Sequence, residues 1–122
     1  MVTARDSVAI IEDEPISRRA LAMLLRDCGY NAHAYRTAEE FLSDLVDGNE
    51  PSVVLADVDL PGLSGLELLE QLERRFPQLD AVLITAADND HVHRFRQQHS
   101  CGYLRKPLDL PTLLSLLNQM QA

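Results

Sequence analysis

Five short runs of strand-forming residues, each followed by a segment with helical periodicity, restrict this chain to a small set of folds. The runs are residues 8–11, 31–35, 53–56, 81–85 and 102–104, of which 31–35 is the weakest. Nearly continuous apolar strands that alternate with helices are typical of a parallel sheet buried on both faces. We therefore predict an α/β, doubly wound (βα)5 fold, in which helices cover both faces of a five-stranded parallel sheet.

Capping residues and apolar spacing indicate where the helices begin and what they bury. The first helix is expected to follow Pro15, to have one apolar face formed by Ile16, Ala20 and Leu24 and flanked by Leu21 and Leu25, and to end at Gly29 near Cys28. Two later segments have the capping-box spacing, in which a Ser or Thr precedes a Glu by three positions. The residues expected to cap these helices and the last one are Thr37, Ser64 and Asp109.

The composition is that of one ordinary globular domain, residues 1–122, with 46% hydrophobic and 25% charged residues. Its net charge of −8 argues against binding of nucleic acid or an anionic membrane by the domain itself. The N-terminus lacks the apolar core of a signal peptide, and no run approaches a membrane span. Cys28 and Cys101 match no disulfide framework, so we expect buried or half-buried thiols and a cytoplasmic location.

Polar side chains follow four of the predicted strands at the point where each strand ends. Because the carboxyl ends of parallel strands meet at one edge of the sheet, these side chains are expected to line a shared pocket. In chain order they are Glu12, Asp13, Glu14, Asp57, Asp59, Thr85, Arg105 and Lys106.

The charges of this pocket predict a metal ion. Glu12, Asp13 and Asp57 against the single ammonium of Lys106 leave a net charge of −2. Crowded carboxylates resist full ionisation unless a cation joins them, and an all-oxygen ligand set favours Mg²⁺. Magnesium binds phosphate oxygens, and a carboxylate nucleophile beside it suits the formation of an aspartyl phosphate. The hydroxyl of Thr85 and the ammonium of Lys106 are suitable donors to that phosphoryl group.

Four motifs in this order resemble the receiver (CheY-like) domain of two-component response regulators. They are "IIEDE", "LADVDLPGLSGLELL", "LITA" and "GYLRKPL", and the resemblance covers essentially the whole chain. The stretch "GYNAHAYRTAEEFL" further resembles receivers joined to LuxR-type helix-turn-helix outputs. The resemblance implies a flavodoxin-like fold and a switch that controls an output domain, in most cases one that regulates transcription.

The resemblance also implies a role for each residue of the acidic pocket. Asp57 would accept a phosphoryl group from a sensor histidine kinase or a phosphotransfer protein. Asp13 and Asp57 would bind Mg²⁺ directly, Glu12 would act through water, and the backbone carbonyl of Asp59 would complete the protein ligands. The chain would then be a phosphorylation-dependent switch, with no catalysis beyond its own phosphotransfer and dephosphorylation.

Thr85 and Lys106 would hold the phosphoryl group, and Tyr103 matches the aromatic residue that swings inward as Thr85 moves. The output surface would comprise the helix after Thr85, the fifth strand and the last helix. A homodimer linked to phosphorylation fits this family, and DNA would be reached only through a separate output domain. The bond between Lys106 and Pro107 is a candidate for the cis isomer, which is accessible mainly before proline.

Three alternative functions can be compared with this interpretation. "ADVDLPG" also resembles the DxDx motif of haloacid-dehalogenase phosphatases, with Asp57 as nucleophile and Asp59 as general acid, but those enzymes place the nucleophile on the first strand. A flavodoxin-like cofactor binder needs a phosphate-binding loop where this chain has "EDEP". A receiver that only docks partners, without phosphorylation, shares the fold.

Several polar residues have simpler interpretations. Glu14 is expected to be a helix-start charge favoured by the helix dipole, and the Asp59 side chain to be solvated, although we hypothesise that it tunes dephosphorylation. The segment 88–101 departs from the family and contains three histidines. Alternating His91 and His93 fall on different faces of a helix, so a solvent-exposed face is favoured over a zinc site.

Overall fold

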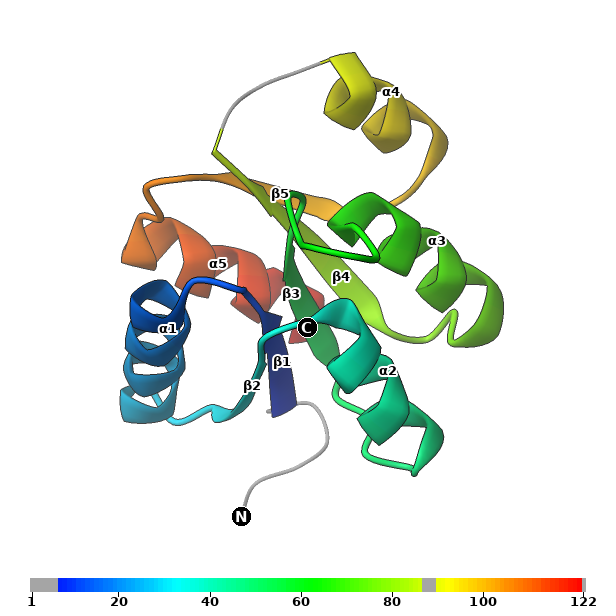
Figure 1. The fold of residues 1–122 in the computed structure, drawn as a ribbon. Coiled ribbons are helices and arrows are strands. Elements are labelled where there is room, and N and C mark those ends of the chain that lie inside the picture. Colours follow the sequence, from blue (N-terminus) through cyan, green and yellow to red (C-terminus); the bar gives the residue numbers. More distant parts are fainter. Residues whose placement is uncertain (1–6, 87–89, 122) are drawn as a thin grey trace.

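Strand and helix alternate five times along the chain, as the sequence predicts (Figure 1). The computed structural model describes residues 7–86 and 90–121. The strands are β1 (Ser7–Ile11), β2 (Asn31–Tyr35), β3 (Val53–Asp57), β4 (Asp80–Thr85) and β5 (Gly102–Arg105). The helices are α1 (Pro15–Asp27), α2 (Ala38–Val46), α3 (Gly65–Arg75), α4 (Asp90–Gln98) and α5 (Leu110–Gln121).

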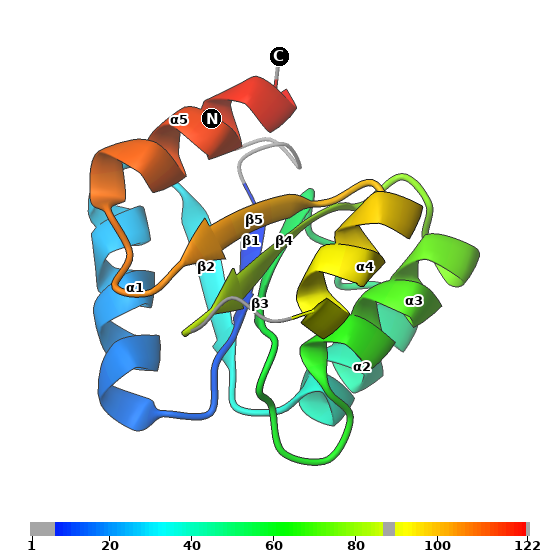
Figure 2. The same cartoon turned by 90° about the horizontal axis from the view of Figure 1, so that it is seen from above.

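All five strands form one parallel sheet in the order β2-β1-β3-β4-β5. Helices α1 and α5 cover one face and α2, α3 and α4 cover the other (Figure 2). Every residue of the central strand β3 is buried, because helices pack on both of its faces. The predicted doubly wound fold is confirmed. The strand order reverses between β1 and β3, where open sheets of this kind bind ligands.

The predicted caps are present, with one difference. The hydroxyl of Thr37 accepts a hydrogen bond from the backbone N–H of Glu40, but the Glu40 carboxylate accepts from Arg36 instead of Thr37. The capping box is therefore complete only at the start of α3, where Ser64 and Glu67 bond reciprocally. The Asp109 carboxylate accepts from the N–H of Thr112 at 3.1 Å and so caps α5.

The predicted apolar face of α1 is correct for its flanking residues Leu21 and Leu25, which are buried, and wrong for its centre. The exposed fractions of Ile16 and Leu24 are 77% and 44%, and Ala20 is also exposed. The helix turns this flank towards the sheet and buries Ala22 beside the two leucines. Two apolar stripes overlap on this helix, and helical spacing alone does not show which of them faces the sheet.

The prediction for the cysteines is also wrong in one respect, because Cys28 at the end of α1 is exposed while Cys101 is half-buried. No helix within residues 7–86 and 90–121 is long and apolar enough to cross a bilayer.

Helix α4 packs on the rest of the domain through two buried residues, Val92 and Phe95. His91 and His93 are both exposed, while His99 contacts Glu73 and stacks on Phe95 with ring centroids 4.1 Å apart. Residues 88 and 89 of the histidine-containing segment lie outside the described residues. Within the described part of the chain, no histidine belongs to a group of three or more close metal-ligand side chains.

Candidate functional site

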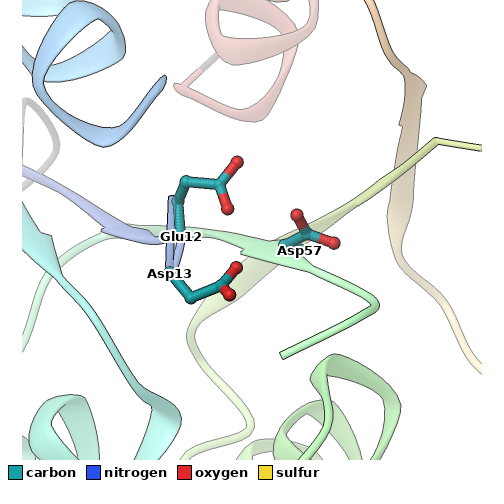
Figure 3. Close-up of side chains that lie close together, drawn as sticks. All are labelled: Glu12, Asp13 and Asp57. Atoms are coloured by element: carbon teal, nitrogen blue, oxygen red, sulfur yellow. The ribbon is translucent and has the colours of Figure 1, made fainter. Parts of the chain in front are cut away.

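Three carboxylates meet beyond the ends of β1 and β3 (Figure 3). Glu12 and Asp13 directly follow β1, and Asp57 is the last residue of β3. The register that pairs Ile11 with Ala56 makes these strand ends neighbours. One oxygen from each carboxylate lies within 4.8 Å of the others. Glu12 and Asp57 are each 6% exposed, whereas Asp13 is open to solvent.

Lys106 reaches this cluster from the C-terminal part of the chain. It directly follows β5, and its Nζ donates at 2.7 Å to Glu12 Oε1 and at 2.7 Å to Asp57 Oδ2. The predicted cis isomer of the Lys106–Pro107 bond is present. The geometry therefore confirms that Lys106, Glu12 and Asp57 share one pocket.

Burial and the hydrogen bonds with Lys106 shift the pKa values of this site in opposite directions. Burial raises the pKa of Glu12 more than its bond with Lys106 lowers it. Burial by itself would lower the pKa of Lys106, but the hydrogen bonds to Asp57 and Glu12 outweigh it and raise that pKa. Lys106 therefore stays protonated, and the cluster keeps an excess of carboxylates over cations.

The second oxygen of Asp57 is held by the chain that follows it. The backbone N–H of Asp59 donates to Asp57 Oδ1 at 2.8 Å, and the Asp59 side chain is exposed. Helix α3 begins directly against this turn. A Cβ at Gly65 would lie 2.3 Å from the carbonyl oxygen of Asp57, so a larger residue would displace the backbone here. The backbone N–H of Asp59 and the ammonium of Lys106 thus each hold one carboxylate oxygen of Asp57.

Thr85 and Tyr103 occupy the neighbouring strands. Thr85 ends β4, is 1% exposed, and lies one residue beyond Ile84, the β4 partner of Asp57. Its carbonyl accepts from the N–H of Lys106 at 2.8 Å. Tyr103 on β5 is half-buried, and the guanidinium of Arg96 lies over its ring, 4.3 Å from the centroid.

Two positioning residues were missed by the sequence reasoning. The Arg18 guanidinium on α1 donates to the carbonyls of Glu12 and Asp13 at 3.1 and 3.2 Å, which holds the turn after β1. The Glu39 carboxylate on α2 accepts from the N–H of Leu63 at 3.1 Å and so anchors the loop after β3. No local pattern reveals these contacts, because each joins a side chain to the backbone of another element.

The simpler interpretation of Glu14 is confirmed. Its carboxylate accepts from the N–H groups of Ile16 and Ser17 and caps α1. These hydrogen bonds lower the pKa of Glu14.

A cavity of about 280 Å³ opens beside Asp57 and Lys106. Its walls are mostly apolar and include Leu24 of α1 and Leu108 after β5. Access to Asp57 from this direction therefore passes over the exposed apolar side of α1.

The cluster fits a small divalent cation. Its donors are carboxylate oxygens, they lie close enough to share one ion, and three carboxylates against one ammonium leave negative charge to neutralise. Hard cations such as Mg²⁺ prefer this donor set and usually retain some water, which the exposed position of Asp13 allows. Sequence and geometry thus agree on an acidic cluster whose donors suit such an ion.

A family model for the response regulator receiver domain matches residues 8–118. The chain belongs to this family. Receiver domains act as phosphoacceptor switches in two-component signalling, and this receiver domain has that role.

The relatives are mostly longer proteins. NtrC, a DNA-binding transcriptional regulator of Klebsiella pneumoniae, is 32% identical over 111 residues, which are 90% of this chain and 24% of NtrC. The positive alginate biosynthesis regulatory protein of Pseudomonas aeruginosa is 34% identical over 116 residues, 93% of this chain and 46% of that protein. The receiver domain described here therefore spans about a quarter to a half of the length of these relatives.

The fold is also that of solved receiver structures. The response regulator TrrA of Thermotoga maritima superposes with a TM-score of 0.83 at 23% identity, covering 93% of this chain and 97% of that chain. At this level of identity the similarity supports the fold alone.

Family membership and the position of the acidic residues argue against two of the three alternatives. Asp57 ends the third strand, whereas the haloacid-dehalogenase interpretation needs its nucleophile on the first. The turn after β1 presents Glu12, Asp13 and Glu14 where a flavodoxin-like phosphate loop would need small, uncharged residues. A receiver domain that only docks partners shares this fold, and experiment must distinguish it.

Proposed function

We propose that Asp57 is the phosphoacceptor of this receiver domain. The observation that carries the proposal is its position at the end of the central strand, buried beside Glu12 and Asp13 and bonded to Lys106. We further propose that Asp13 and Asp57 bind Mg²⁺ directly, with Glu12 acting through water and the backbone carbonyl of Asp59 as a further ligand. The donor would be a phosphohistidine on a sensor histidine kinase or a phosphotransfer protein.

In the proposed reaction, a carboxylate oxygen of Asp57 attacks phosphorus and forms an acyl phosphate. The P–N bond of the phosphohistidine breaks and its electron pair goes to the ring nitrogen, which takes up a proton from water, so that the histidine leaves as neutral imidazole. Bound magnesium would neutralise charge on the phosphoryl oxygens. The Lys106 ammonium lies 2.7 Å from Asp57 Oδ2 and is placed to pair with the new phosphoryl group.

The switch that we propose uses Thr85 and Tyr103. The phosphoryl group would draw the Thr85 hydroxyl and the Lys106 ammonium towards it, and Tyr103 would move with Thr85. A nearly complete population shift requires about 5.5 kcal/mol of differential stabilisation. Hydrogen bonds to a charged group contribute about 1.5–3 kcal/mol each, so a few of them suffice. The surface that changes would be formed by α4, β5 and α5.

A small phosphodonor tests the proposed acceptor without a kinase. The chain is incubated with acetyl phosphate and Mg²⁺, and its intact mass is recorded. We expect one phosphoryl group per chain in the wild type and in Asp59→Asn, and none in Asp57→Asn or with EDTA. Labelling of Asp57→Asn at the wild-type rate would reject the acceptor. An unlabelled wild type would favour the docking-only alternative.

The Asp59 hypothesis has its own test. An exposed carboxylate two residues from the acyl phosphate is placed to repel or misplace attacking water. We expect Asp59→Ala to change the half-life of the phosphorylated chain, measured by loss of label over time. An unchanged half-life would remove this role.

The larger protein is also a matter of proposal. NtrC is a DNA-binding transcriptional regulator, and TrrA has been crystallised in complex with Mg²⁺-BeF. We propose by analogy that residues 1–122 form a cytoplasmic receiver unit that regulates transcription through a separate DNA-binding output domain and has no other enzymatic activity. The LuxR-type output and a phosphorylation-linked homodimer stay predictions, which the reading frame around this segment and sedimentation of the phosphorylated protein will test.

A further inference from the structure

One exposed glutamate of α2 contacts the loop that follows β3. The Glu39 carboxylate accepts a hydrogen bond from the backbone N–H of Leu63 at 3.1 Å, although 24 positions separate the two residues in the chain. A Cβ placed on Gly62 would lie 2.7 Å from Glu39 Oε2, so the carboxylate also lies against the backbone next to Leu63. Figure 2 shows this loop passing the start of α2. We call the contact between Glu39 and residues 62–63 the Glu39 clamp.

A position at the start of a helix does not account for this contact. Glu39 and Glu40 both lie in the first turn of α2, where the helix dipole favours a negative charge. The Glu40 carboxylate is directed to Arg36, from whose N–H it accepts at 3.3 Å. Glu39 is directed to another element instead. The two neighbours therefore form a matched pair, with the same charge in the same turn and different partners.

The loop that the clamp holds carries the groups that direct Asp57. The N–H of Asp59 donates to Asp57 Oδ1 at 2.8 Å, and the Asp59 carbonyl is the backbone ligand proposed for Mg²⁺. Leu60, which is 7% exposed, anchors the first part of the loop, but Gly62 at the tip is exposed and has a φ of +70°. Glycine restricts the backbone less than any other residue, so a contact from another element limits how far this tip moves.

We propose that Glu39 is a positioning residue of the metal and phosphoacceptor site. By fixing the loop from α2, it keeps the Asp59 N–H on the Asp57 carboxylate and limits movement of the Asp59 carbonyl. Groups that orient metal ligands without touching the ion commonly change affinity by about 10–100-fold. Glu39 acts one step further away, through the loop, so we expect a smaller factor of about five. The inference rests on the proposed function, because it concerns the Mg²⁺ site proposed there.

Calorimetric titration of the chain with Mg²⁺ tests this role. We expect Glu39→Ala to weaken Mg²⁺ binding about fivefold and Glu39→Gln to retain most of the affinity, because an amide oxygen still accepts from the N–H of Leu63. Glu40→Ala removes the same charge from the same turn and should bind Mg²⁺ as the wild type does. This comparison separates the clamp from the attraction of a distant carboxylate for the ion.

Gly62→Ala perturbs the clamp from the side of the loop. Its methyl group would meet Glu39 Oε2 and displace the carboxylate, while the strain at a φ of +70° is the same whichever residue occupies position 39. If both residues act through one contact, Glu39→Ala should weaken Mg²⁺ binding much less in the Gly62→Ala chain than in the wild type. Additive losses would mean that Glu39 acts independently of the loop, which overturns the proposal.

Two further measurements separate positioning from a general loss of structure. Amide hydrogen exchange of the metal-free chain should be faster at Leu63 and Asp59 in Glu39→Ala than in Glu39→Gln. Labelling by acetyl phosphate should be several-fold slower in Glu39→Ala below saturating Mg²⁺, and most of this difference should disappear at saturation, because the ligand groups are intact. Urea titration of each variant measures whether the fold retains its stability.

The proposal is overturned by any of three results besides additivity. They are wild-type Mg²⁺ affinity in Glu39→Ala, equal weakening by Glu39→Ala and either Glu39→Gln or Glu40→Ala, and unchanged exchange of the Leu63 and Asp59 amides in Glu39→Ala. Failure of the proposed function gives a different result. A wild-type chain that binds no Mg²⁺ and takes up no phosphoryl group rejects that function together with the positioning role, whereas normal binding by Glu39→Ala rejects the positioning role alone.

Discussion

Lys106 offsets part of the negative charge of three neighbouring carboxylates. Its ammonium bonds to both Glu12 and Asp57, and those bonds keep it protonated. The same contacts place it in competition with a cation, because an ion that binds Asp57 must share this carboxylate with the ammonium.

Replacing Lys106 with Met should therefore tighten Mg²⁺ binding while it weakens the response to phosphorylation. A unit positive charge about 5 Å from a divalent ion opposes it by an energy of order 1.5 kcal/mol in water, which corresponds to about a tenfold change in affinity. Calorimetric titration with Mg²⁺ measures the effect. Arg105→Gln removes the same charge from the exposed neighbouring position and serves as the control. An affinity for Mg²⁺ that is unchanged or weaker in Lys106→Met would contradict the account.

Sequence reasoning found the site residues that directly follow strands and missed those that reach in from helices. Asp57 and Lys106 are recognisable because a charge ends an apolar strand, and parallel topology then brings them together. Arg18 and Glu39 bond to backbone groups of other elements, and exposed charges on helices are usually only solvated. The positioning residues of this site could therefore be found only from the folded structure.

At the scale of elements, one side-chain hydrogen bond joins the edge strand β2 to α2. The Tyr35 hydroxyl donates to Asp44 Oδ2 at 2.7 Å, and the Tyr35 ring packs edge-on against Phe41. Burial raises the pKa of Tyr35, and the bond to Asp44 raises it further. The folded domain therefore retains this proton at a pH where the unfolded chain loses it.

This shift predicts a loss of stability in alkali. Below the unfolded tyrosine pKa of about 10 the contribution is fully present, and it declines as the pH rises from there towards the higher folded value. The free energy of unfolding of Tyr35→Phe, which lacks the ionisable group, should fall less steeply than that of the wild type above about pH 10. Urea titrations at several pH values measure both. Parallel curves for the two proteins would show that Tyr35 does not carry the effect.

Element types and order were predictable, but the orientation of some helices was not. Caps at Ser64 and Asp109 and the apolar strands define where elements begin. On α1, apolar residues surround much of the helix, so the predicted face is centred on the exposed Ile16 and Leu24, and only its flank of Leu21 and Leu25 is buried. Which stripe faces the sheet depends on the path of the chain from β1, which is not a local property.

At the scale of the whole molecule, the strand order creates the site. Because β1 lies between β2 and β3, the acidic turn after β1 meets the end of β3. The chain after β5 supplies Lys106 to the same edge of the sheet. The exposed side of α1 borders this edge, with Leu24 in the wall of the cavity beside Asp57. We therefore expect a protein that delivers a phosphoryl group to the buried Asp57 to approach across this side of the domain.

Leu24→Asp should therefore slow phosphotransfer from a histidine kinase and leave labelling by acetyl phosphate unchanged. Interface residues that carry binding energy cost more than about 1 kcal/mol when they are removed, so we expect a decrease of about tenfold in rate. Transfer of radioactive phosphate from the kinase measures it. Met23→Asp is the matched control, because Met23 is 62% exposed on the same helix but does not line the cavity. Equal slowing by both variants would mean that this wall has no special role.

The most direct test of the central claim is a crystal structure of the chain with Mg²⁺ and beryllofluoride. We predict a Mg²⁺ ion bound by the carboxylates of Asp13 and Asp57, and beryllofluoride attached to Asp57 within hydrogen-bonding distance of Thr85 and Lys106. Beryllofluoride on another residue, or an Asp57 side chain turned away from Asp13 and Lys106, would contradict the account.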